Sequence, residues 1–294
     1  MRLEAKAATE AIAEGALFYG PSEAESRVHY ERGQFRDLWQ GRNDMWDSEE
    51  GLEQYRGWVP GRRIRDFECV LPDMHYSVMA DVITNMEALE RFVVHGVKDA
   101  MQALAPLRQH VETLVELDIR DCGLTSEMLV MFLEQCPQLE VFTADKVDAA
   151  VAVVSQPWTC ASMRQLQIEF YSEPETSSSS GFDEKQKWMI ERLAGLLSLV
   201  RFCMPEYWHR GGLDPLKRLT RVQDVQFIPT SVEKLTAADA KWMVEHWPVL
   251  RTIRIPATHY NFQIPLDSAR VLKYHGVEFR SVKESTCPWG CSPK

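Results

Sequence analysis

The stretch LVELDIRDCGL, residues 114–124, decides the fold of this chain. Its first six residues follow the pattern L-x-x-L-x-L, and the polar residue Asp118 stands between the apolar residues Leu117 and Ile119. Side chains of a β-strand point alternately to opposite faces, so this alternation predicts a strand with one buried face and one polar face. The glycine-containing end of the stretch indicates that the chain turns away after the strand.

The same six-residue pattern recurs along the chain with a period near 25 residues. Four copies begin 25 residues apart, and the following intervals are 24, 34, 25 and 28 residues. The first residues of the eight copies are Ile64, Leu89, Leu114, Leu139, Met163, Leu197, Val222 and Leu250. A fixed period of this length is typical of solenoids, whose units bury their apolar side only against neighbouring units.

The strand positions predicted to point inward are apolar in every copy. The first inward column contains Phe67, Phe92, Leu117, Phe142, Leu166, Val200, Val225 and Ile253. The second contains Cys69, Val94, Ile119, Ala144, Ile168, Phe202, Phe227 and Ile255. We therefore predict an α/β leucine-rich-repeat solenoid, curved, with parallel strands on the concave face and helices on the convex face. Unrelated strands of an ordinary α/β sheet are the alternative.

The segments between the strands predict helices with recognisable ends. Thr125 or Ser126 caps a helix whose apolar residues recur every three or four positions until Pro137. Thr236 and Asp239 resemble a capping box at the start of a second such helix, which stops before Pro248.

Three regions depart from the repeat. Residues 1–57 contain helical stretches without a repeat and are predicted to cap the solenoid, whose repeats occupy residues 58–280. Residues 172–187 are serine-rich and polar, which predicts a flexible insertion. Residues 281–294 form a C-terminal tail, and we interpret its Cys287 and Cys291 as part of a loose structural segment rather than a metal site.

The composition argues against several classes of protein. A net charge of -10 and a pI near 5.4 disfavour nucleic-acid binding. Seven irregularly spaced cysteines are untypical of a disulfide framework, and no apolar run suggests a signal peptide or a membrane span. We therefore expect a soluble protein of the cytoplasm or nucleus, without a membrane or nucleic-acid partner. The common nucleotide, zinc-protease and hydrolase motifs are missing, so we predict no catalytic residues, no metal site and no cofactor.

The repeats resemble those of a known family. Cys122 within LVELDIRDCGL, Cys160 before MRQLQI, the prolines that end two helices and the closing sequence HGVEF, residues 275–279, are similar to the cysteine-containing repeats of fungal F-box and leucine-rich-repeat proteins. The resemblance covers about residues 58–280. It implies that the repeats hold a substrate which an F-box delivers to a cullin-type ubiquitin ligase through an adaptor, although no F-box is visible ahead of the repeats.

We accordingly predict a protein-interaction module that binds a partner protein on the concave strand surface, with components of a ubiquitin ligase as further partners. Acidic side chains concentrate in the middle repeats and two arginines lie towards the C-terminal end, so the partner should have a complementary order of charge. An enzyme with its site in residues 1–57 or in the tail is the alternative. The predicted partner-binding residues are Arg91, His95, Glu116, Asp118, Arg120, Gln165, Gln167, Glu169, Arg201, Asp224, Gln226 and Arg254.

Overall fold

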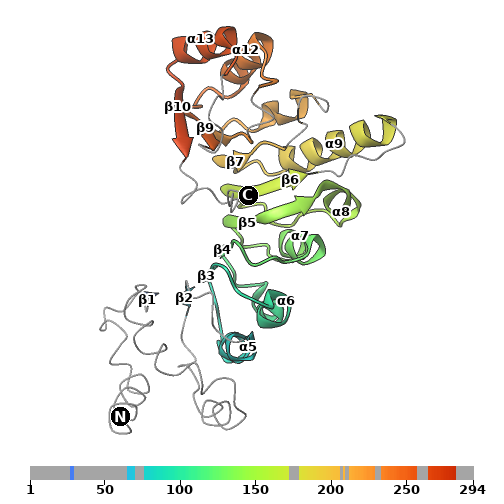
Figure 1. Ribbon diagram of the computed structural model, residues 1–294, viewed down its shortest axis with the longest axis vertical. Coiled ribbons are helices and arrows are strands. Elements are labelled where there is room, and N and C mark those ends of the chain that lie inside the picture. Colours follow the sequence, from blue (N-terminus) through green and yellow to red (C-terminus); the bar gives the residue numbers. More distant parts are fainter. Residues whose placement is uncertain are drawn as a thin grey trace. The chain divides into compact units, whose positions relative to one another are not determined.

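The chain repeats a β-strand followed by a helix, and its strands are parallel, which is the predicted leucine-rich-repeat arrangement (Figure 1). It divides into two compact units, Met1–Cys122 and Gly123–Lys294. The computed structural model describes residues 27–29, 65–69, 76–171, 179–205, 208, 212–228, 233–256 and 264–282.

Among the described residues of the first unit, four strands pair in parallel in the order of the sequence. Figure 1 shows helices α5 and α6 on one side of strands β3 and β4. The elements of this unit are β1 (Arg27–His29), β2 (Asp66–Cys69), α5 (Tyr76–Thr84), β3 (Arg91–Val94), α6 (Ala100–Ala103), the 3-10 helix η1 (Ala105–His110) and β4 (Glu116–Ile119).

In the part of the second unit that the structure describes, six strands pair in parallel, again in the order of the sequence. Helices α7, α8 and α9 lie on one side of strands β5 to β7 (Figure 1). The elements are α7 (Ser126–Gln135), β5 (Val141–Asp148), α8 (Ala149–Val154), β6 (Gln165–Tyr171), α9 (Ser179–Ala194), β7 (Arg201–Cys203), the 3-10 helix η2 (Asp214–Arg218), β8 (Asp224–Gln226), α12 (Ala237–His246), β9 (Thr252–Pro256), α13 (Leu266–Tyr274) and β10 (Glu278–Val282).

The inward columns form the core of each unit. In the first unit Phe67, Phe92 and Leu117 are register partners on neighbouring strands, and the two phenylalanine rings stack with centroids 5.4 Å apart. All three side chains are buried. In the second unit the matching column runs through Phe142, Leu166, Phe202, Val225 and Ile253, which are buried too. The first inward column predicted from the sequence is therefore confirmed, apart from one repeat. In the second column, Ile255 is only half-buried.

That repeat is LSLVRF, whose predicted register is wrong by two residues. Leu166 pairs with Phe202 and not with Val200, so the repeat begins at the buried Leu199. Leu197, the predicted first residue, has 48% of its surface exposed. A shift of two residues leaves every side chain on the same face, which explains why the alternating pattern did not reveal the error.

The structure adds a strand at each end of the predicted set. Strand β1 pairs with β2, with Val28 and Phe67 as register partners, and strand β10 pairs with β9, with Phe279 and Ile253 as register partners. Residues 27–29, inside the region expected to be a helical cap, are thus a strand, and the rest of residues 1–57 lies outside the described residues.

The serine-rich insertion is partly helical. Helix α9 begins at Ser179, so residues 179–187 differ from the expected flexible loop, and residues 172–178 lie outside the described residues. Glu184, Lys185, Gln186 and Lys187 are favourable helix formers, and the buried residues that follow in α9 anchor it to the core. In the tail, residues 281 and 282 belong to β10, whereas Cys287 and Cys291 lie outside the described residues.

Both predicted helix caps are confirmed. The side chain of Thr125 accepts a hydrogen bond from the Met128 backbone at the start of α7. At the start of α12, Thr236 and Asp239 form a reciprocal capping box. Helices α7 and α12 end at Gln135 and His246, two residues before the prolines.

Side chains also bind carbonyl groups of the preceding repeat on the helix side. Gln109 and His110 contact the Ile83 carbonyl near the end of α5, at 2.9 and 3.0 Å. Thr159 donates to the Glu134 carbonyl of α7, and Trp247 donates to the Leu216 carbonyl of η2. The last carbonyls of a helix have few partners within it, and these contacts add side-chain donors at such positions. The Ile83 and Leu216 carbonyls also accept from the backbone of Met86 and Leu219.

Candidate functional site

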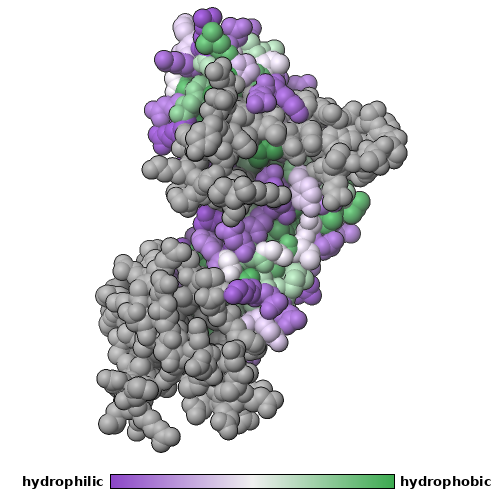
Figure 2. Space-filling model, viewed as in Figure 1, coloured by the Kyte–Doolittle hydropathy of each residue, from purple (hydrophilic) through white to green (hydrophobic). Residues whose placement is uncertain are grey.

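Polar side chains line the face of the strands that points away from the buried columns, called here the strand face. In the view of Figure 2, hydrophilic residues gather over strand β4. Two of the predicted binding residues lie in this strand, and a third directly follows it. These three are Glu116, Asp118 and Arg120. The polar columns predicted from the sequence are therefore a surface of the folded chain.

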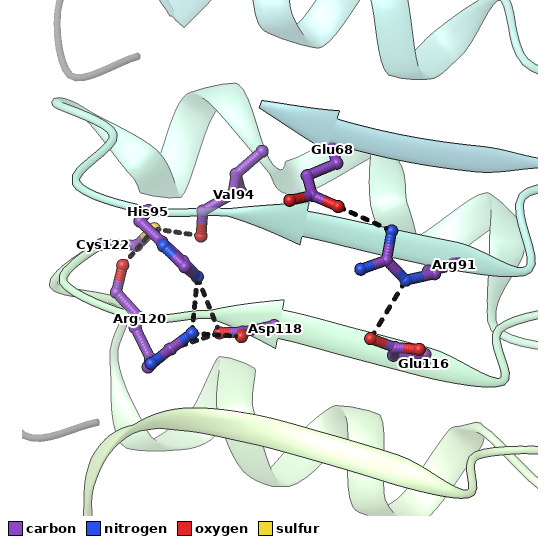
Figure 3. Close-up of polar contacts among 8 residues, drawn as sticks. All are labelled: Glu68, Arg91, Val94, His95, Glu116, Asp118, Arg120 and Cys122. Atoms are coloured by element: carbon purple, nitrogen blue, oxygen red, sulfur yellow. Dashed lines mark hydrogen bonds and ion pairs between the residues drawn. The ribbon is translucent and has the colours of Figure 1, made fainter. Parts of the chain in front are cut away.

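On the first unit the strand face carries the Arg91 triplet, which is Glu68, Arg91 and Glu116 (Figure 3). Arg91 of β3 bonds to Glu68 of β2 through Nη1 at 2.9 Å and pairs with Glu116 of β4 through Nε at 3.1 Å. Burial alone would lower the pKa of Arg91, but the two glutamates raise it above its usual value. The triplet therefore holds one cation between two anions from neighbouring strands.

Beside the triplet lies the Asp118 cluster, which is His95, Asp118 and Arg120 (Figure 3). Arg120 donates to Asp118 from Nε at 2.8 Å and from Nη2 at 2.6 Å. Burial alone would raise the pKa of Asp118, but hydrogen bonds from His95 and Arg120 outweigh it and leave that pKa below its usual value. Asp118 is consequently a carboxylate at neutral pH.

His95 lies between a hydrogen-bond acceptor, Asp118, and a hydrogen-bond donor, Arg120. Its Nε2 is 3.1 Å from Oδ1 of Asp118 and 3.0 Å from Nη2 of Arg120. A ring nitrogen that carries hydrogen donates to Asp118, whereas a bare ring nitrogen accepts from Arg120. The protonation state and tautomer of His95 therefore decide which of the two residues it binds.

The strand face of the second unit carries the Asp224 cluster, which is Gln165, Arg201, Asp224 and Arg254 on strands β6 to β9. Arg201 donates to Oδ2 of Asp224 at 2.9 Å and to the side-chain oxygen of Gln165 at 3.2 Å. Arg254 donates to Oδ1 of Asp224 at 3.1 Å and to Oδ2 at 2.8 Å. One buried carboxylate thus fixes two arginines from the strands on either side of it.

The other predicted residues of the second unit lie on the same face. Gln226 follows Asp224 on β8 and is the register partner of Arg254. Gln167 and Glu169 belong to β6, and Glu169 is buried and lies 3.6 Å from Lys146 of β5. Every residue predicted to bind a partner is thus placed on a strand or at a strand end, in one group on each unit.

Sequence reasoning identified these side chains but missed their pairing. The 25-residue interval between Arg91 and Glu116 was the available signal, because residues one repeat apart stand side by side on neighbouring strands. Glu68 and Lys146 complete two of the pairs without having been predicted as site residues. The charges of the strand face are consequently bound to one another rather than individually solvated.

The described residues give no support for metal chemistry. Among them no three His, Cys, Asp or Glu side chains are grouped to hold a metal ion. Cys122, Cys136, Cys160 and Cys203 are buried, and burial raises the pKa of Cys160 to about 11. Cys160 is therefore unlike the low-pKa thiolates of reactive sites. Within the described ranges, no helix has the length and apolar character needed to cross a bilayer.

Cys122, the residue that marks the repeat class in the sequence, contacts backbone carbonyls. Its Sγ lies 3.8 Å from the Val94 carbonyl of the preceding repeat and 3.3 Å from that of Arg120 (Figure 3). A thiol is a small apolar group with a weak donor, so it can be buried where the chain leaves the strand. The cysteine therefore joins two repeats at the end of β4.

Comparison with known proteins finds similar chains among the solved structures. No protein-family model matches the chain, and neither does any curated protein. Among solved structures, the chain is similar to the leucine-rich repeat-containing protein LegL7 from Legionella pneumophila, with 10% sequence identity and a TM-score of 0.29, over 72% of this chain and 90% of that one. We therefore base the fold assignment on the repeat spacing and the strand register.

Proposed function

We propose that this chain is a protein-interaction module and that its strand face binds the partner. The observation that carries the proposal is the Arg91 triplet, in which three strands contribute three mutually fixed charges. Partly exposed ion pairs contribute little to the free energy of folding. Fixed charges, by contrast, lower the entropy lost when a partner binds and set its specificity and rate of encounter.

The charge of the strand face describes the expected partner. The Arg91 triplet has two carboxylates for one guanidinium, so it favours a basic group. The Asp118 cluster pairs one carboxylate, that of Asp118, with one guanidinium, that of Arg120. A partner that places a lysine or arginine against Glu68 or Glu116 would find acceptors already held in position.

A finer proposal concerns the pathway. The resemblance of the repeats to those of fungal F-box proteins supports a role as the substrate receptor of a cullin-type ubiquitin ligase. This role requires a segment or a second protein that binds the cullin adaptor while the strand face holds the substrate. Copurification of the tagged chain with the adaptor, tested by mass spectrometry, would support the role, and its consistent absence would count against it.

The experiment that tests the binding surface is carboxyl footprinting of the chain with and without a partner captured from its native lysate. Bound partner should protect Glu68 and Glu116 from carbodiimide labelling. Glu127 and Glu191 are exposed on helices α7 and α9 and should be labelled equally in both states. Protection of the helix residues with unchanged labelling of the strand residues would overturn the proposal.

A further inference from the structure

We infer that the Asp224 cluster, together with Gln226, binds a carboxylate, and that the partner presents an acidic segment of aspartate or glutamate residues to it. This inference rests on the proposed function, because it assigns the chemistry of one part of the same strand face. Two arginines accompany one aspartate in the cluster, so its formal charge is positive although the whole chain carries -10.

The hydrogen bonds of the cluster leave donors in excess. Both oxygens of Asp224 are occupied, since Oδ1 accepts from Arg254 and Oδ2 accepts from Arg254 and Arg201. Nη1 of Arg254 has no acceptor within the described part of the chain, and Arg201 has hydrogens left on both Nη atoms after its bonds to Asp224 and Gln165. A carboxylate supplies acceptors in the fork geometry that guanidinium groups match.

Gln226 provides an independent sign of a missing acceptor. Only 3% of its surface is exposed, and its Nε2 has no hydrogen-bond partner among the described residues. It shares the face of Asp224, two residues earlier on β8, and stands beside Arg254 in the register of β8 and β9. A buried amide without an acceptor is costly, so a carboxylate oxygen held beside Arg254 would satisfy a group that folding alone leaves unsatisfied.

Asp224 holds Arg201 and Arg254 in position to bind a carboxylate. It has only 11% of its side chain exposed, whereas the side chains of Arg201 and Arg254 are 33% and 25% exposed. The aspartate fixes both guanidinium groups and the arginines still reach solvent. Two cations held close together attract an anion locally. Salt screens the repulsion between that anion and more distant negative charges of the chain, because the screening length is about 8 Å.

The test is equilibrium binding of a fluorescein-labelled hexaglutamate peptide to the full chain at roughly physiological salt, with hexalysine as the opposite probe. Arg254→Gln should weaken hexaglutamate binding roughly tenfold or more, because it removes charge-assisted hydrogen bonds. Arg221→Gln removes the same charge from an exposed turn outside the Asp224 cluster and should leave the affinity unchanged. Arg201 still binds Asp224 in the Arg254 variant, which favours its folding.

Gln226→Met is a second variant. Its affinity for hexaglutamate and its melting temperature together separate an effect on binding from an effect on folding. It should weaken hexaglutamate binding roughly threefold or more and raise the melting temperature, because the unsatisfied buried amide is gone. Failure of hexaglutamate to bind, or equal binding by wild type, Arg254→Gln and Gln226→Met, overturns the inference. Protection of Glu68 and Glu116 by the natural partner does not depend on this peptide, so the proposed function can survive that result.

Discussion

Arg120 holds Asp118 with two hydrogen bonds, from Nε to Oδ1 at 2.8 Å and from Nη2 to Oδ2 at 2.6 Å, although the two residues are only two positions apart. Alternate residues of an extended chain share a face, which makes the contact possible. His95 of the preceding repeat closes the group, and Asp118 keeps only 14% of its side chain exposed. An aspartate on the strand face is thus part of the structure and not a freely solvated charge.

Asp118→Asn should destabilise the fold at neutral pH by about 1–3 kcal/mol, since it removes charge-assisted hydrogen bonds. The pKa of Asp118 is lowered in the folded state, so its stabilising effect is complete above the unfolded pKa near 4 and is lost as the pH falls through the folded pKa. Urea denaturation at pH 7 and pH 3.5 should show the difference between wild type and variant shrinking in acid. A difference that is constant with pH would contradict the assignment.

Leu117→Asp should be far more damaging than any change at its neighbour. Leu117 is fully buried beside its register partner Phe92, so a carboxylate there loses its hydration without gaining a partner. We expect a loss of more than about 4 kcal/mol and an unfolded protein at room temperature. A cooperative thermal transition near that of the wild type, measured by circular dichroism, would show that the inward column is misassigned.

Protonation of His110 should make the stability of the fold depend on pH near neutrality. Burial lowers its pKa, although the hydrogen bond to Ile83 acts in the opposite direction. A base whose folded pKa is lowered stabilises the fold fully above its unfolded pKa near 6.5 and progressively less below it. The melting temperature of the wild type should therefore fall between pH 7.5 and pH 5.5 by more than that of His110→Gln, and parallel curves would refute the effect.

Thr236→Ala should cost about 1 kcal/mol, because the capping box of α12 loses the hydroxyl that binds the Asp239 backbone. Thr220→Ala, at an exposed position outside the helices, is the matched control and should change stability by less than about 0.5 kcal/mol. Both are measured by urea denaturation. Equal losses would mean that the cap does not stabilise the helix.

The fold was largely predictable because a solenoid repeats its core positions once per unit. Leu117 and its counterparts at strict spacing identified the strands and their buried face. The register of the repeat around Phe202 was not predictable, since Leu197 and Leu199 are two residues apart and satisfy the same alternation. The first half of helix α9 was predicted as a loop, because polar residues of good helix propensity leave no apolar stripe there.

The position of the polar side chains on the strand face was predictable from the sequence, whereas their pairing was not. Strand alternation places Asp118 and Asp224 on the polar face, yet burial of a polar side chain depends on its neighbours in space. Arg201 lies beside Asp224 and Gln165 only after the two-residue correction of the register. The unsatisfied amide of Gln226 has no signal in the sequence at all, because it is defined by contacts that are missing among the described residues.

The most direct test of the strand face as a binding surface exchanges the charges of the Arg91 triplet, with Glu68→Lys, Arg91→Glu and Glu116→Lys in one variant. The three side chains can still pair with one another, so the melting temperature should stay within about 5 °C of the wild type. The affinity for the captured partner, measured by titration calorimetry, should fall at least about tenfold, because the charge that faces the partner is reversed. Glu191→Lys makes the same net change in charge on helix α9 and should bind as the wild type does. Unchanged affinity of the folded triplet variant, with loss of binding by Glu191→Lys, would contradict the assignment of the strand face as the binding surface.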